Sequence, residues 1–219
     1  DWSSDVCSSD LFGNFRRAFQ VILQATNIAE WDKITDKRRQ DLLVYIALTA
    51  FGDRPKFSQF SLTVQNDIKG LFGSYKKACN LADLMLFSLG KPDVLAKCCR
   101  QSEIGLKQSN SLWVHISALS ELDSLLRLYE GCASRTIGRL EDVTAIKFYA
   151  NKPKIAYLFY PDFDTEAHPV LQAAMEIDLQ DLRVSYYDYA GDYNPPILHR
   201  KDSLVSPDYR SEEHTSELQ

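Results

Sequence analysis

The densest cluster of potential metal ligands lies in residues 161–169, PDFDTEAHP. Asp162, Asp164 and His168 offer carboxylate oxygens and an imidazole nitrogen, which are donor types that bind magnesium, manganese or zinc. The sequence therefore contains a candidate metal-dependent enzyme site with these three residues as candidate catalytic groups. The alternative is an Asp-rich turn, bracketed by Pro161 and Pro169, whose carboxylates accept hydrogen bonds from the local backbone.

Two other parts of the sequence bear on this site. A nuclease-like site would also carry Glu-x-Lys on the following strand, whereas residues 176–178 read EID and contain no lysine. His199, a further candidate catalytic group, opens a basic run (residues 199–201) that could meet a phosphate or pair with the acidic cluster. The alternative for this run is a solvated strand end. His115 alternates with apolar residues and is expected to be a partly buried, hydrogen-bonded histidine.

Three groups of basic residues are candidates for contacts with DNA phosphates. In chain order they are Arg16 and Arg17; Lys37, Arg38 and Arg39; and Lys76 and Lys77. The first and third groups belong to an internal similarity, residues 12–19 (FGNFRRAF) against residues 72–79 (FGSYKKAC), in which Asn or Ser is expected to begin a helix. The alternative is that all three groups are solvated faces of helices that bury an apolar side elsewhere.

Charge is divided unevenly along the chain. Residues 12–107 contain 15 Lys and Arg against 9 Asp and Glu, and residues 108–209 contain 9 against 15. The asymmetry is compatible with a nucleic-acid surface on the first half. It is equally compatible with a protein-interaction module in which the two halves complement one another electrostatically.

The two ends of the chain are related to each other at the level of DNA. Residues 1–11 (DWSSDVCSSDL) and residues 210–219 (RSEEHTSELQ) can be encoded by opposite strands of one oligonucleotide, which has the sequence of a library adapter. We therefore expect both ends to be artefacts of metagenomic sequencing and exclude them from reasoning about the fold. The natural sequence is then expected to be an internal fragment, residues 12–209.

Residues 12–209 lack the motifs of several enzyme classes. They contain no Gly-x-Gly for a nucleotide or adenosylmethionine loop, no Gly-x-Ser-x-Gly elbow, and no Cys-x-x-Cys or His-x-x-x-His for zinc. The four cysteines, Cys79, Cys98, Cys99 and Cys132, are expected to be buried thiols in a reducing cytoplasm. No run of about 18 apolar residues occurs, so no membrane span is expected.

The spacing of apolar residues predicts a helical region over residues 12–108. An apolar stripe at helical spacing covers residues 15–29. The next helix is expected to be capped by Thr35 and to stop at Gly52, and the polar residues 101–110 are expected to form a linker. Further helices are expected over residues 62–71, 74–89 and 93–100.

Residues 109–209 are expected to form an α+β region. A helix capped by Ser120, with Asp123 three residues later, is expected to end near Gly138. Strands are expected over residues 112–116, 145–149, 155–160, 174–179 and 182–189, the last two as a hairpin. The predicted fold class is α+β, with a helical first half followed by an α+β half that has a mostly antiparallel sheet.

Five segments resemble, nearly word for word, a bacterial family of methyltransferases associated with DNA phosphorothioation. These segments are residues 29–40 (AEWDKITDKRRQ), 71–78 (LFGSYKKA), 128–133 (LYEGCA), 160–165 (YPDFDT) and 194–201 (NPPILHRK). The resemblance extends over residues 12–209.

The resemblance implies a role beside a DNA-modification and restriction system that replaces a non-bridging phosphate oxygen of DNA with sulfur. In that family a domain that binds S-adenosylmethionine precedes the region seen here, so the cofactor is implied for the full-length protein and not for this fragment. We expect a cytoplasmic accessory region that positions DNA or a partner protein of the phosphorothioation system and transfers no methyl group alone. The alternatives are the metal-dependent enzyme and the protein-interaction module described above.

Overall fold

The computed structural model describes residues 14–138, 140–206 and 209. The predicted adapter ends, residues 1–11 and 210–219, lie outside the described residues. The chain divides into two compact units, Asp1–Leu42 and Leu43–Gln219. This division falls within a helix, whereas the boundary predicted between residues 108 and 109 rests on the change from helices to strands.

The first unit contains helix α2 (Phe15–Ala25) and most of helix α3 (Ile28–Leu48). The side-chain oxygen of Asn14 caps α2 by accepting a hydrogen bond from the backbone N–H of Arg17 at 2.8 Å. The side chain of Asn27 accepts a hydrogen bond at 3.0 Å from the N–H of Ala29, near the start of α3. Both helices therefore begin at an asparagine whose carboxamide satisfies an otherwise unpaired backbone donor.

The prediction that Thr35 caps a helix is wrong, because Thr35 lies inside α3. A polar side chain precedes the actual start of α3 at Asn27, where it can satisfy the first unpaired N–H groups. The chain between the two helices is tied by the indole N–H of Trp31, which donates to the hydroxyl of Thr26 at 2.7 Å. The Trp31 ring also lies edge-on to Phe19, with ring centroids 6.5 Å apart.

The remaining helices belong to the second unit. They are α4 (Leu62–Phe72), α5 (Tyr75–Ser88), α6 (Pro92–Gln101) and α7 (Ser124–Ile137), with short 3₁₀ segments at Thr49–Phe51, Phe57–Gln59, Ile116–Glu121 and Lys201–Ser203. The predicted helices over residues 62–71, 74–89 and 93–100 are confirmed to within one residue at each end. Among the described residues, no helix combines the length and the apolar character needed to cross a membrane.

Of the two helix caps predicted in this unit, one is confirmed and one is wrong. Ser74 begins α5 as the internal similarity predicts, because its hydroxyl accepts a hydrogen bond from the N–H of Lys77 at 3.3 Å. The predicted cap Ser120 lies instead in a 3₁₀ turn, and Asp123 caps α7. Gly138 ends α7 with a φ of 82°, as the sequence indicates.

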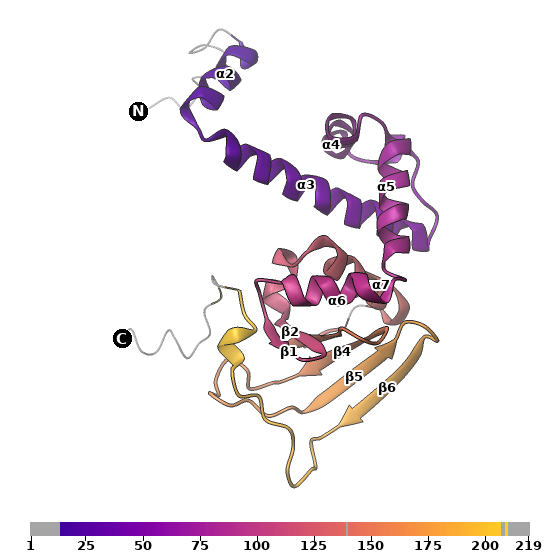
Figure 1. Cartoon of the computed structure of the whole chain (residues 1–219), viewed down its shortest axis with the longest axis vertical. Helices are drawn as coiled ribbons and strands as arrows, with labels where there is room; N and C mark the ends of the chain where they lie inside the picture. The colour runs from indigo at the N-terminus through magenta and orange to yellow at the C-terminus, as the bar shows by residue number, and fades with distance from the viewer. Residues whose placement is uncertain (1–13, 139, 207–208, 210–219) are drawn as a thin grey trace, which may run out of the picture. The chain divides into compact units, whose positions relative to one another are not determined.

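The strands form one six-stranded sheet in which each strand pairs with the next along the chain (Figure 1). The strands are β1 (Leu106–Gln108), β2 (Ser111–His115), β3 (Ala145–Tyr149), β4 (Lys154–Phe159), β5 (Ala173–Asp178) and β6 (Arg183–Asp188). Every pairing is antiparallel, which confirms the predicted α+β class. The predicted linker, residues 101–110, is wrong over β1, because these three residues pair with β2 in a short hairpin.

One face of the sheet is covered by α6 and α7 (Figure 1). Alternate residues of β2 to β5 point to this face, and each is 3 % exposed or less. They are Leu112, Val114, Ile146, Phe148, Ile155, Tyr157 and Ile177. Leu95 and Cys99 of α6 and Leu126 and Ala133 of α7 complete this main core.

The opposite face is covered by two stretches of chain that flank the β5–β6 hairpin, residues 160–171 and 196–206, here called the strap. The two stretches are joined by the N–H of Leu171, which donates to the carbonyl of Pro196 at 2.9 Å. The strap is tied to β2 by the N–H of His115, which donates to the carbonyl of Leu204 at 2.8 Å. Phe163, Leu171 and Leu204 of the strap pack against the sheet.

Gly105, which leads into β1, is the position where the fold is least tolerant of a side chain. Its φ is +95°, and a Cβ atom there would lie 2.6 Å from the backbone oxygen of Trp113. Because the backbone is in the left-handed region and the clash is with backbone, we expect Gly105→Ala to lower the free energy of unfolding by about 2–3 kcal/mol in urea titrations followed by circular dichroism.

Gly191→Ala is the matched control, because its backbone is ordinary and a Cβ atom there meets nothing within 4 Å. We expect that variant to remain within about 0.5 kcal/mol of the wild type. Equal unfolding midpoints and slopes for the two variants would contradict the close approach of Gly105 to β2.

Candidate functional site

The acidic turn over residues 161–169 lies at the surface of the strap. Asp162 is exposed, and its backbone carbonyl accepts a hydrogen bond from the N–H of Glu166 at 2.9 Å. The carboxylate of Asp164, which is partly buried, accepts a hydrogen bond from the hydroxyl of Tyr209. The contact at Asp162 is a local hydrogen bond of the turn, whereas Asp164 bonds to a residue 45 positions further along the chain, so the two aspartates have different surroundings.

Of the four candidate catalytic residues, the structure brings His168 and His199 together. Their rings lie edge to face with centroids 5.2 Å apart, because the two stretches of the strap run side by side. Among the residues that the structure describes, no group of three or more His, Cys, Asp or Glu side chains is placed to hold a metal ion. The geometry thus provides a pair of imidazoles rather than the combined carboxylate and histidine set.

Lys201 connects the basic run over residues 199–201 to the acidic turn. Its side chain is buried, and its ammonium group donates to the carbonyl oxygens of Phe163 at 3.0 Å and Glu166 at 2.7 Å. The amine therefore binds the backbone of the turn. The sequence left open whether this run meets the acidic cluster, and Lys201 is the residue that does so.

His115 is hydrogen-bonded, as predicted, and is fully rather than partly buried. Its ring stacks on Phe163 with centroids 4.6 Å apart. Nδ1 accepts a hydrogen bond from the N–H of Ser117 at 3.2 Å and lies 2.8 Å from the hydroxyl of the same residue. Burial lowers the pKa of His115, against the opposing effect of the negative charge on Asp164, and the neutral ring fits the structural role predicted for it.

All seven candidate DNA-contacting cations lie on helices. Six of them are exposed, namely Arg16, Arg17, Lys37, Arg38, Lys76 and Lys77. Arg39 is partly buried and lies 3.5 Å from a carboxylate oxygen of Asp36, one turn earlier in α3. The candidate cations are therefore surface side chains on helices.

Two of the cation pairs occupy equivalent places. Arg16 and Arg17 lie in the first turn of α2, and Lys76 and Lys77 lie in the first turn of α5, in each case separated from the capping residue by one aromatic residue. The first turn of a helix carries the positive end of the helix dipole and favours negative groups. Neither first turn contains an acidic residue, so positive charge accumulates at both helix starts.

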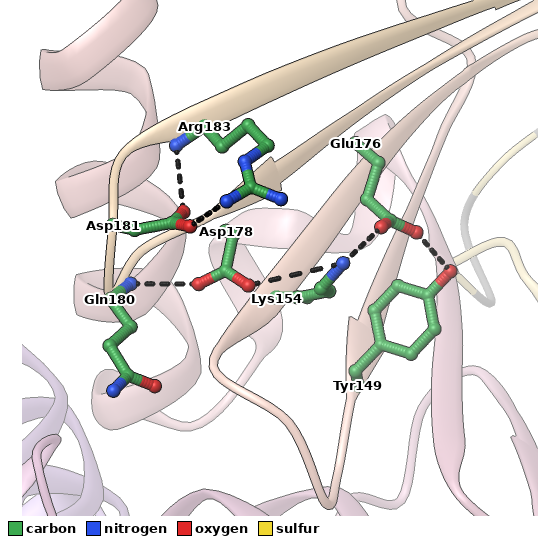
Figure 2. Close-up of polar contacts among 7 residues, drawn as sticks. All are labelled: Tyr149, Lys154, Glu176, Asp178, Gln180, Asp181 and Arg183. Carbon is green, nitrogen blue, oxygen red and sulfur yellow. Dashed lines mark hydrogen bonds and ion pairs between the residues drawn. The ribbon is translucent and has the colours of Figure 1, made fainter.

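A second polar cluster lies on the strap side of the sheet, where β3, β4 and β5 are adjacent (Figure 2). Glu176 is its centre: one carboxylate oxygen lies 2.7 Å from the amine of Lys154, and the other accepts a hydrogen bond from the hydroxyl of Tyr149 at 2.8 Å. The amine of Lys154 also lies 3.9 Å from Asp178. The cluster therefore joins three consecutive strands through side chains.

The charge on Glu176 is stabilised by its neighbours. Burial acts to raise its pKa, but the hydrogen bonds from Lys154 and Tyr149 and the positive charges of Lys154 and Lys147 outweigh burial, so that the pKa of Glu176 lies below its usual range. Burial, the hydrogen bond and the carboxylate together raise the pKa of the Tyr149 hydroxyl. Tyr149 is thus a neutral hydrogen-bond donor to an ionised carboxylate.

Lys147 lies beside this cluster on β3. Its ammonium nitrogen is 4.9 Å from the ring centroid of Trp113 and 4.5 Å from that of Tyr149. Burial lowers the pKa of Lys147, and the charge of Glu176 opposes this effect. The positive charge of Lys147, which is partly buried, is therefore stabilised by two aromatic rings and one nearby carboxylate.

This cluster was missed at the sequence level because its members come from different strands. Residues 176–178 of β5 contain no lysine, whereas Lys147 and Lys154 reach the same face of the sheet from β3 and β4. The alternation of residues along a strand indicates that Lys147 and Tyr149 share one face of β3. It does not indicate which residues of the neighbouring strands lie beside them, because that depends on the pairing register.

No protein-family model, curated protein or solved structure matches this chain.

The lowered pKa of Glu176 predicts how acid affects the sheet. Glu176→Gln removes the ionised partner of Lys154, so we expect a lower free energy of unfolding at pH 7 in urea titrations. A carboxylate whose folded pKa is depressed stabilises the fold above its unfolded pKa, about 4.3, and this contribution is lost as the pH falls through the folded value. The difference between wild type and variant should therefore shrink from about pH 5 downward.

Asp188→Asn is the control, because Asp188 is an exposed carboxylate on β6 outside the cluster. A stability difference between wild type and Glu176→Gln that stayed constant from pH 7 to pH 3 would contradict the ionised state assigned to Glu176.

Proposed function

We propose that this chain is an accessory, DNA-positioning region of a bacterial methyltransferase that works beside a DNA phosphorothioation system in the cytoplasm. The five segments that resemble that family support the biological setting. The single observation that supports a contact with DNA is the pair of cations at each of two helix starts, Arg16 with Arg17 and Lys76 with Lys77.

The chemistry of these helix starts suits phosphate. A phosphate group is an anion with several acceptor oxygens, and it is attracted both by the cations and by the positive end of the helix dipole. Lys37 and Arg38 add exposed positive charge to the first unit. Contacts of this kind orient a protein on DNA without reading its sequence, which is the task of a positioning region.

Methyl transfer is assigned to a part of the full-length protein other than this chain. S-adenosylmethionine is bound by a glycine-rich loop between a strand and a helix of a β-α-β unit. The described residues do not fit this cofactor, because their sheet is antiparallel throughout and contains no β-α-β unit. In this proposal the chain contributes affinity and orientation, and the cofactor domain contributes the reaction.

A second candidate function is recognition of a partner protein of the same system. Along α5, Leu81, Leu84 and Phe87 follow one another at three-residue spacing and are 46 %, 68 % and 77 % exposed. Exposed apolar side chains at this spacing on one helix are typical of surfaces that bind another protein. This observation favours a protein contact at α5 in addition to the phosphate contacts.

The proposed DNA contacts should be visible as a salt-dependent affinity. For the 219-residue chain and a DNA duplex, we expect the logarithm of the association constant to fall linearly with the logarithm of salt concentration. Replacing Arg16, Arg17, Lys76 and Lys77 together by Ala should reduce the magnitude of that slope by up to about 3.6 and weaken binding, because each phosphate contact contributes about 0.9. Fluorescence anisotropy, with and without phosphorothioate linkages in the duplex, measures both quantities.

A triple replacement of Lys37, Arg38 and Arg39 by Ala tests the remaining candidates in the same assay. The matched control removes three exposed cations from the other half of the chain, Arg135, Lys152 and Arg183, and should leave the slope unchanged. The absence of binding at low salt would contradict the DNA-positioning role. A partner protein whose binding is lost in Leu84→Asp and Phe87→Asp variants would then support the second candidate.

A further inference from the structure

The largely apolar cavity in the second unit belongs to none of the sites described so far. Its volume is about 610 Å³, which lies within the range of small-molecule sites, roughly 300–1,000 Å³. Helices α5, α6 and α7 form one side of it with side chains that include Leu86, Leu95 and Cys132. The connections β3–β4 and β5–β6 form the other side with residues that include Lys152 and Leu182.

The walls of this cavity differ in charge from the second half of the chain, which supplies most of the lining residues. Residues 108–209 contain 15 acidic residues against 9 basic ones, yet no Asp or Glu lines the cavity, and Lys152 is the one charged side chain among the described residues that line it. Lys152 is exposed, at the β3–β4 connection. An apolar space with one cation and no anion complements an apolar molecule that carries a negative group.

Two lining residues reinforce this assignment. Leu182 has a φ of 57° and is 58 % exposed, so the hairpin holds a bulky apolar residue in a disfavoured backbone conformation at the cavity. The thiol of Cys132 adds no negative charge to the wall, because burial and the carboxylate of Glu130 raise its pKa to about 11.

We infer that this cavity binds a small amphipathic anion, an aliphatic or aromatic body with a single carboxylate or sulfonate group, with its body between α6, α7 and the β5–β6 turn and its negative group towards Lys152. The inference is independent of DNA binding, because none of the seven candidate DNA-contacting cations lines the cavity. The site adds a small-molecule ligand to a chain whose proposed function concerns a macromolecule.

The test uses two fluorescent probes that differ in charge. Anilinonaphthalene sulfonate carries the negative group, and its parent phenylnaphthylamine does not. We expect the wild-type chain to bind both and Lys152→Gln to weaken the sulfonate about 3- to 5-fold, the upper end of what an exposed ion pair contributes, while binding of the uncharged parent stays unchanged. Lys97→Gln, an exposed cation of α6 outside the cavity, should bind both probes as the wild type does.

A second pair of variants tests the location without disturbing the core. Thr136 is exposed and lines the cavity, whereas the neighbouring Arg135 is exposed and does not. Thr136→Trp should weaken both probes at least 5-fold by occupying their space, and Arg135→Trp should weaken neither. Equal affinities of all variants for both probes would overturn the inference.

Chemical protection of Cys132 provides an independent readout. Decanoate, an aliphatic carboxylate, should displace the sulfonate probe and slow the alkylation of Cys132 by N-ethylmaleimide several-fold, as followed by peptide mass spectrometry. Cys79 lies outside the cavity and should react at the same rate with and without decanoate. Unchanged alkylation of Cys132 at saturating decanoate would overturn the assignment, and so would equal slowing at both cysteines.

Discussion

The constraint on which the second unit depends is that the central strand β4 buries apolar residues on both of its faces. In β4, four consecutive residues, Ile155 to Leu158, are buried, and a strand of this kind must be covered on both sides to be stable in water. Helices α6 and α7 cover one side and the strap covers the other. Covering both faces at once requires the strap to lie against the sheet, and it brings the chain segments 160–171 and 196–206 close together.

The strap is held to the sheet by polar contacts as well as by apolar packing. Burying the ammonium group of Lys201 costs free energy unless its hydrogen bonds are replaced, and the carbonyls of Phe163 and Glu166 provide that replacement. The acidic turn is therefore part of the mechanism that fixes the strap. Its aspartates owe their positions to this anchoring, and the same constraint brings His168 close to His199.

Elements with a local signal could be predicted from the sequence, and elements that depend on distant pairing could not. The alternating residues of β5 and β6 and the caps Asn14 and Ser74 are local patterns, and the structure contains them as expected. The strand β1 has three residues without a clear alternation, and it exists because β2 offers a partner. The Glu176 cluster was missed for the same reason, since Lys154 and Tyr149 become its neighbours through strand register alone.

The distribution of charge is better understood from local compensation than from the totals of the two halves. On the sheet, Glu176 and Asp178 are compensated by Lys154, and Asp181 by Arg183, so part of the negative excess is neutralised where it occurs. At the starts of α2 and α5 no acidic residue shares the first turn with the cations, and the helix dipole adds to their charge. One such helix start lies in each compact unit. In the proposed DNA-positioning role, each unit therefore offers phosphate the same local chemistry, and the proposed contacts do not depend on a particular arrangement of the two units.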